Sequence, residues 1–306
     1  MSVDYLKVLQ GMKIKTTVFC RSKKSSEKFK KITGVTAEHG ILSDHLKNYS
    51  SYDYAIIAVD LENLFSVSKT IIESDIKNIL YEKPGGITSK EIFKLENISK
   101  IKNTKLFIAY NRRFYASVNE AVKIVNKDGG IISFNFDFSE WSHVIKTLKI
   151  PKVAKKNWFL CNSSHVIDLA FFLGGLPVEI SSFTSGKGNI SWHPNSSIFT
   201  GSGFTKNSTF SYHANWISPG RWGIELFTKK NKIILQPLEE LKIQKIGQLE
   251  SKNIKIDNKL DLKYKPGLYK QVESFLVNDH KSLCSISDQK YQLSFYEKIS
   301  GNIFKA

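Results

Sequence analysis

Short apolar segments that alternate with helical ones dominate the first third of this 306-residue sequence. The predicted strands are rich in β-branched and aromatic residues and cover residues 14–20, 54–59, 78–81 and 105–110. Apolar residues recur at helical spacing around and between them, over residues 3–12, 25–32, 61–74 and 88–99. Strands joined by helices of this length run parallel, in a sheet that helices cover on both faces. We therefore predict a doubly wound α/β domain over residues 1–113.

The pattern changes after Gly129-Gly130, where predicted strands follow one another with few helices between them. These strands cover residues 131–138, 179–184, 208–216, 222–227 and 232–235. Helical spacing is confined to residues 116–126, 165–173, 268–277 and 288–299. Successive strands joined by tight turns pair antiparallel. The sequence thus predicts a second, α+β domain over residues 114–306, with a large, mostly antiparallel open sheet.

The charge and composition of the chain indicate which kinds of partner to expect. Its net charge is +17, but the lysines are spread along the sequence, as is typical of solvated faces. Such charge also attracts anionic partners such as nucleotides or sugar nucleotides. No arginine-rich stripe or helix-turn-helix pattern indicates a nucleic-acid partner, and no Cys or His spacing indicates a metal.

The apolar runs are far shorter than the roughly 20 residues of a membrane span. No basic and then apolar order marks a secretion signal at the N-terminus. The three cysteines, Cys20, Cys161 and Cys284, are far apart, and any pairing would leave one over. We therefore expect no disulfide framework and a cytoplasmic location.

The segment Tyr81–Gly86 follows the predicted strand at residues 78–81. The carboxyl ends of parallel strands form the edge at which ligands bind in such sheets. Lys83 lies there between the end of the strand and Pro84, which keeps the Lys83 backbone extended. Its side-chain amine can take up or release the proton of a hydroxyl. The alternative is a surface lysine before a loop.

A second segment, Asn162–Leu169, opens a predicted helix. His165 and Asp168 are three residues apart and share one helix face, and Ser164 is placed to cap the helix. A histidine there can act as a general acid or base that the nearby carboxylate orients. A capped core helix with a structural His–Asp contact explains the same residues.

Three segments together resemble the Gfo/Idh/MocA oxidoreductases, the relatives of glucose–fructose oxidoreductase and inositol dehydrogenase. They are Glu82-Lys83-Pro84, the run Tyr110–Phe114 (Tyr-Asn-Arg-Arg-Phe) and the run His165–Leu169 (His-Val-Ile-Asp-Leu). The resemblance extends over nearly the whole chain. It implies a Rossmann domain followed by an open-sheet domain, and reversible NAD(P)-dependent oxidation of a sugar, sugar-nucleotide or cyclitol hydroxyl. It also implies a homodimer or homotetramer.

The resemblance assigns roles to individual residues. Lys83 and His165 would be the catalytic acid and base, and Asp168 would support them or bind substrate. The expected cofactor contacts lie at strand ends and are Arg21, Ser22, Lys23, Val59, Glu82, Lys83 and Pro84. The expected substrate contacts suit a polar, anionic sugar and are Asn111, Arg112, Arg113, Trp216 and Arg221. Edge-strand packing is the alternative reading of the tryptophans.

The sequence departs from the family pattern at its start. A dinucleotide fold needs a first strand that runs into a Gly-x-Gly-x-x-Gly turn, which binds the pyrophosphate. That strand and its first two glycines have no counterpart here, since the chain begins inside the following helix. Either the true start lies upstream, or the protein is a non-catalytic relative that binds a ligand or serves in assembly.

Two further departures concern single positions. The acidic residue that binds the ribose in NAD enzymes is replaced by Arg21-Ser22-Lys23-Lys24, which favours NADP over NAD. Solvated loop charge explains the same residues. Family members often carry an aspartate four residues before the histidine, and Cys161 stands at that position, where we expect a small packed side chain.

Overall fold

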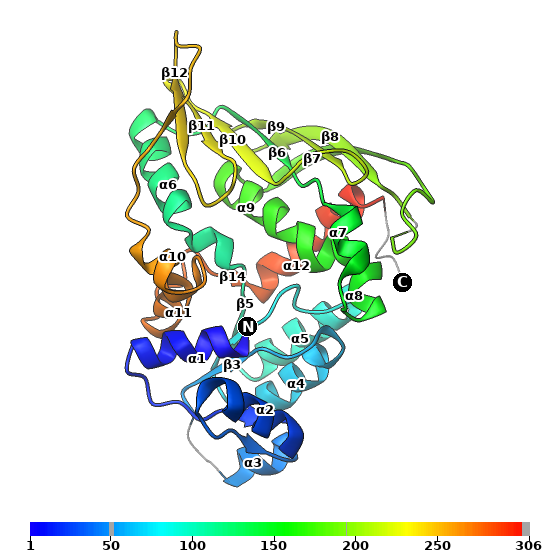
Figure 1. Cartoon of the computed structure of the whole chain (residues 1–306), viewed down its shortest axis with the longest axis vertical. Helices are drawn as coiled ribbons and strands as arrows, with labels where there is room; N and C mark the ends of the chain where they lie inside the picture. Colours follow the sequence, from blue (N-terminus) through cyan, green and yellow to red (C-terminus); the bar gives the residue numbers. More distant parts are fainter. Residues whose placement is uncertain (49–51, 194, 302–306) are drawn as a thin grey trace. The chain divides into compact units, whose positions relative to one another are not determined.

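The computed structural model of the chain describes residues 1–48, 52–193 and 195–301 (Figure 1). The chain divides into two compact units. The first unit comprises residues 1–109 and 260–289, and the second comprises residues 110–259 and 290–306. The expectation of a single boundary at residue 113 did not include this return of the chain to the first unit.

The first unit contains two small sheets. In the larger one, three parallel strands, β3 (Tyr54–Ile57), β4 (Asn78–Tyr81) and β5 (Lys105–Ile108), are joined at β5 by antiparallel β14 (Cys284–Ser285). The other sheet pairs β1 (Phe19–Cys20) with β2 (Glu38–His39), also parallel. The helices of this unit are α1 (Ser2–Gly11), α2 (Lys23–Thr33), α3 (Leu42–Asn48), α4 (Leu61–Glu73), α5 (Ser89–Ile101), α10 (Lys259–Lys263) and α11 (Leu268–Leu276).

Local sequence explains most of these boundaries. Thr88 and Glu91 form a capping box at the start of α5, and Gly34 ends α2 with a left-handed backbone (φ 76°). The predicted helix over residues 25–32 starts earlier than expected: the Ser22 side chain accepts the hydrogen bond of the Ser25 amide, and α2 begins at Lys23. The predicted strand at residues 14–20 shortens to β1, since only its last two residues pair with β2.

The return segment belongs to the first unit because its apolar side chains are buried there. Leu268, Val272 and Phe275 of α11 are fully buried, and α11 packs against α1. The Phe275 ring makes edge contacts with Tyr54 of β3 (5.4 Å between centroids) and Phe107 of β5 (6.2 Å).

The second unit is built on one sheet of eight strands in the order β13-β12-β11-β10-β6-β9-β8-β7 (Figure 1). All neighbours pair antiparallel except β6 and β9, which are parallel. The strands are β6 (Ser133–Asp137), β7 (Pro177–Ser185), β8 (Ile198–Thr205), β9 (Thr209–Asn215), β10 (Gly223–Phe227), β11 (Asn231–Leu235), β12 (Lys242–Lys245) and β13 (Lys252–Asn253). The expected fold class, a Rossmann-like parallel region followed by a mostly antiparallel sheet, is confirmed.

Helices cover one face of this sheet. They include α6 (Ala116–Asp128) and α9 (Ser164–Gly174), which lie against the central strands (Figure 1). Phe171 of α9 makes edge contacts with Phe136 and Phe210, at 5.5 and 5.3 Å. Gly174 permits this close approach, because a Cβ there would lie 2.2 Å from the Phe134 ring.

Three short elements connect β6 to α9, and one helix ends the chain. The connecting elements are α7 (Ser142–Thr147), α8 (Lys152–Lys156) and the π-helical turn η2 (Phe159–Ser163). The 3-10 turn η1 (Asn111–Phe114) opens the second unit. The last helix, α12 (Ile286–Ile299), begins in the first unit and ends in the second. In the described part of the chain, no helix combines the length and the apolarity of a membrane span.

Candidate functional site

In the first unit, Glu82 lies where β4 ends and α1 begins. The Tyr5 hydroxyl, in the first turn of α1, donates to Glu82 Oε1 at 3.1 Å. The Glu82 amide donates to the Ile57 carbonyl of β3 at 2.9 Å. Burial raises the pKa of Glu82, and the positive charge of Lys83 opposes that shift. The start of a helix and the carboxyl ends of two parallel strands therefore meet at Glu82.

Lys83 is half-buried and is followed by a turn that packs tightly against the sheet. Gly85 has a left-handed backbone (φ +88°), and a Cβ there would lie 2.8 Å from Ile108 Cδ1 and 2.8 Å from the Tyr81 hydroxyl. The Gln289 side-chain amide donates to the Pro84 carbonyl at 3.0 Å. The tight packing of Gly85 and the hydrogen bond to Pro84 therefore fix the turn that follows Lys83.

The other expected cofactor residues also follow parallel strands. Arg21, Ser22 and Lys23 come directly after β1, and all three are exposed. The Ser22 hydroxyl is occupied as the cap of α2, whereas Arg21 and Lys23 extend into solvent. Val59 follows β3 and is 37% exposed.

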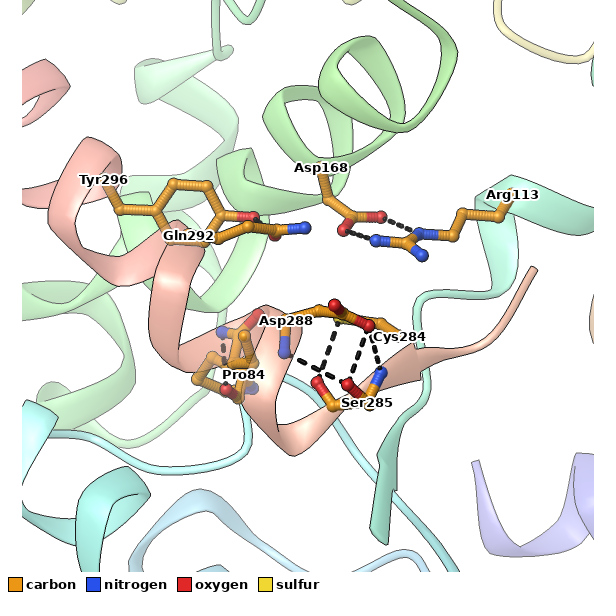
Figure 2. A network of polar contacts seen from close by, with 9 residues as sticks. Pro84, Arg113, Asp168, Cys284, Ser285, Asp288, Gln292 and Tyr296 are labelled. Atoms are coloured by element: carbon orange, nitrogen blue, oxygen red, sulfur yellow. Dashed lines mark hydrogen bonds and ion pairs between the residues drawn. The ribbon is translucent and has the colours of Figure 1, made fainter. Parts of the chain in front are cut away.

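In the second unit, two of the expected site residues bind each other. Arg113 Nε donates to Asp168 Oδ2 at 2.8 Å, and Arg113 Nη2 donates to Asp168 Oδ1 at 2.5 Å (Figure 2). Both side chains are buried. This two-pronged ion pair joins η1 to α9. Asn111, on the same turn, is buried as well.

His165 lies near the start of α9 between two aromatic rings. Its ring centroid is 5.9 Å from that of Tyr110 and 6.4 Å from that of Trp222. The predicted cap at Ser164 was wrong, because η2 runs directly into α9 and the Ser164 hydroxyl donates to the Leu160 carbonyl at 2.6 Å. His165 therefore sits within a continuous helical segment, without the unpaired amides of a free helix start.

The remaining expected substrate residues surround Trp222. The guanidinium carbon of Arg112 lies 4.7 Å from the Trp222 ring centroid, and that of Arg221 lies 4.9 Å from it. Trp216, in contrast, is 1% exposed, and its indole N–H donates to the Phe138 carbonyl at 3.3 Å. It packs on Phe199 of β8, at 5.1 Å between ring centroids.

Sequence reasoning missed Glu140, which follows β6 and is 2% exposed. Its Oε1 accepts from the Ser163 hydroxyl at 2.8 Å and from the Asn162 side-chain amide at 3.0 Å. Burial raises the pKa of Glu140 to about 7, although both hydrogen bonds and the charge of Arg221 oppose the shift. A sequence signal was present, because Glu140 is the last acidic residue before Asp168.

Cys161, at the position where family members often carry an aspartate, is half-buried and lies within η2. Glu140 thus brings a carboxyl group to the residues beside Cys161. Among the described residues, no group of three or more His, Cys, Asp and Glu side chains is arranged to hold a metal ion.

No protein-family profile and no curated protein matches this chain. Solved structures do match it. An oxidoreductase from Agrobacterium radiobacter, in complex with NAD+, L-tartaric acid and magnesium, is 13% identical, with 99% of this chain and 93% of that chain covered and a TM-score of 0.76. Levoglucosan dehydrogenase, in complex with NADH and levoglucosan, is 16% identical over 99% and 93%, with a TM-score of 0.75.

A third similar structure is UDP-N-acetylglucosamine 3-dehydrogenase from Acidithiobacillus ferrooxidans. It is 13% identical, with 98% of this chain and 93% of that chain covered and a TM-score of 0.74. The likeness spans both units of the chain. The chain therefore has the fold of these oxidoreductases, with a Rossmann-like region and a large antiparallel sheet.

Proposed function

We propose that the chain is an NAD(P)-dependent oxidoreductase that acts on a hydroxyl or ketone of a sugar, sugar nucleotide or cyclitol. The observation that carries this proposal is the position of Lys83 beside Glu82, where β3 and β4 end and the first turn of α1 begins. In doubly wound sheets, ligands bind at the carboxyl ends of the parallel strands, which supports a ligand site here. Fold likeness to oxidoreductases solved with NAD+ or NADH supports it.

The residues present suit a nicotinamide dinucleotide in chemical terms. Arg21 and Lys23 are exposed cations directly after β1, the position that contacts the adenosine ribose in such folds. Two cations favour a 2′-phosphate, so we propose NADP in preference to NAD. When bound, the nicotinamide would exchange a hydride with the substrate carbon.

The protein's own groups would handle the proton. Oxidation of an alcohol releases a proton from the hydroxyl on the carbon that loses its hydride. We propose that Lys83 and His165 take up or return this proton. Asp168 is fully engaged by Arg113, so its proposed role is to hold η1 and α9 together rather than to transfer a proton.

A second candidate function is a non-catalytic binding or assembly module. The observation that favours it is that the parallel strands of the first unit lie in two separate sheets. Within the described residues, β1 and β3 are not hydrogen-bonded to each other and belong to separate sheets. In the described part of the chain, β1 pairs only with β2 and β3 pairs only with β4, so each leaves one edge open to another partner.

Replacement of Lys83 by Met separates the two functions. NADPH oxidation is followed by absorbance with a panel of keto sugars, and NADP+ reduction with the corresponding alcohols. We expect Lys83→Met to lower kcat by about 100-fold or more, the usual contribution of a general acid or base. Lys90→Met is the matched control, since Lys90 is exposed in the first turn of α5. Equal rates for the Lys83 variant and the wild type would contradict the proposal.

The uncovered face of the eight-stranded sheet suggests self-association. Phe183 of β7 and Phe204 of β8 are 67% and 53% exposed, and the register of the two strands places them on the same face. We propose that this face pairs with a second copy, as a homodimer or within a homotetramer. Light scattering measures the mass directly, and a monomer at micromolar concentration would contradict this.

The free thiols of Cys20, Cys161 and Cys284 are in keeping with the proposed cytoplasmic location.

A further inference from the structure

The second unit carries an alternating stack of arginine and tryptophan side chains, here called the Arg–Trp stack: Arg112, Trp222, Arg221 and Trp141. Both guanidinium groups lie within 5 Å of the Trp222 ring centroid, at 4.7 and 4.9 Å. Arg221 also lies 4.8 Å from the Trp141 ring. The Trp141 indole N–H donates to the Gly220 carbonyl at 2.8 Å, which fixes the outer ring beside Arg221. Cation–π contact therefore gathers two positive charges around one indole ring.

These two charges have no counter-ion in the described part of the chain. Neither Arg112 nor Arg221 forms an ion pair there, whereas the adjacent Arg113 is fully paired with Asp168. Burial lowers the pKa of Arg112, and the positive charge of Arg221 acts in the same direction. The carboxylates of Glu140 and Glu239 act on Arg112 from beyond ion-pair distance.

Glu140, the buried acid near the stack, compensates these charges only in part. Its hydrogen bonds come from the neutral groups of Ser163 and Asn162. Because its pKa is about 7, much of the Glu140 population is protonated and uncharged at neutral pH. The stack therefore retains a net positive charge when no ligand is bound.

Two further observations indicate a missing ligand that is rich in acceptors. The Trp222 indole N–H is buried, and it has no acceptor among the described residues. A buried N–H donor without an acceptor destabilises the protein, and an acceptor on a ligand would relieve that cost. In addition, residues 141–167 contain no acidic side chain and five lysines, at positions 146, 149, 152, 155 and 156. The segment that begins at Trp141 therefore carries a net positive charge.

The Arg–Trp stack also adjoins the proposed proton-transfer group. The centroid of the Trp222 ring lies 6.4 Å from that of His165. A group bound by Arg112 and Arg221 would thus lie near the histidine.

The geometry points to an anion subsite: Arg112 and Arg221, with the Trp222 ring that both contact, bind a carboxylate or phosphate group carried by the sugar substrate. This inference rests on the proposed function for the identity of the substrate, but the subsite itself is defined by direct binding. The substrate class is therefore a uronic acid or a phosphorylated sugar rather than a neutral sugar.

Isothermal titration with D-glucuronate, D-glucose 6-phosphate and D-glucose tests the subsite without cofactor. We expect the wild type to bind at least one of the two anionic sugars about tenfold or more tightly than glucose, which is the size of one charge-assisted hydrogen-bond contribution. A preference for glucuronate identifies a carboxylate subsite, and a preference for glucose 6-phosphate a phosphate subsite. Arg221→Gln should remove the preference and leave the affinity for glucose within about twofold.

Lys149→Gln is the matched control, because it removes one exposed positive charge from the lysine-rich segment outside the stack. It should preserve the preference for the anionic sugar. Equal binding of the three sugars, no binding of either anion at about 10 mM, or equal losses in Arg221→Gln and Lys149→Gln would overturn the subsite.

The two proposals fail in different ways. Retained anion binding without any NADPH or NADH turnover would overturn the proposed function alone. Turnover of neutral sugars without anion binding would overturn the subsite alone. Circular dichroism of each variant establishes that the losses do not come from unfolding.

Discussion

Two buried carboxyl groups in the second unit have different partners. Asp168 receives two hydrogen bonds from the Arg113 guanidinium, so each charge is neutralised by the other. Glu140 receives its hydrogen bonds from Ser163 and Asn162, which are neutral. Arg112 and Arg221 interact electrostatically with Glu140, but they stack on Trp222 and form no ion pair with Glu140 in the described part of the chain. Charges that are satisfied internally hold the fold, and charges that are left without a counter-ion are available to a ligand.

The largest expected effect concerns the satisfied pair. Asp168→Asn leaves the buried Arg113 charge without its partner, and we expect the free energy of unfolding to fall by about 3–5 kcal/mol. Urea denaturation followed by circular dichroism measures this change. The double variant Arg113→Met/Asp168→Leu removes both charges and should recover most of the loss. A loss below about 1 kcal/mol for Asp168→Asn is typical of exposed ion pairs. It would contradict the large contribution to stability that we expect from this buried pair.

A smaller effect, which depends on pH, is expected at Glu140. Its pKa is raised from 4.5 to about 7 in the folded protein, so the native state keeps a proton that the unfolded chain releases. The stability from this group is therefore complete below pH 4.5 and is lost as pH rises to about 7. The lost free energy is about 3 kcal/mol.

Glu140→Gln isolates this contribution, because its side-chain oxygen can still accept from Ser163 and Asn162. Relative to the wild type, the variant should gain about 3 kcal/mol of stability between pH 4.5 and pH 8, with most of the gain below pH 7. Urea denaturation at a series of pH values measures it. If the difference in the free energy of unfolding between Glu140→Gln and the wild type did not change with pH, Glu140 would titrate at its ordinary pKa. The proposed contrast between Glu140 and Asp168 would then be wrong.

Local pattern predicted much of the fold. The strand at residues 78–81 has the predicted bounds, and α4, α5 and α6 end within two residues of the expected positions. These elements have strong apolar periodicity, and Thr88 or Gly129 marks one end of α5 and α6. Residues 14–18 are β-branched apart from Lys15 but do not form a strand, because only Phe19 and Cys20 find a partner in β2. Strand propensity alone could not show where the pairing ends.

The sequence supplied candidate site residues, but it did not supply the contacts between them. Lys83, Arg112 and Arg221 were selected from sequence, because basic residues beside strand ends and aromatic residues are recognisable locally. The Arg113–Asp168 ion pair was not, since 55 residues separate its members. Glu140 was missed for the same reason, because its neighbours Asn162 and Ser163 are distant in sequence. Which side chains pair with one another depends on tertiary contacts, and the local spacing of residues does not reveal these contacts.

Titration of the chain with NADPH and NADH tests the central claim most directly, because every catalytic role proposed for Lys83 and His165 requires a nicotinamide dinucleotide. Binding is followed by the fluorescence of the reduced nicotinamide. We predict saturable binding below about 1 mM, with NADPH tighter than NADH and with that preference reduced in Arg21→Gln. Absence of binding by both dinucleotides at about 5 mM would contradict the claim and leave the binding or assembly module as the function of this chain.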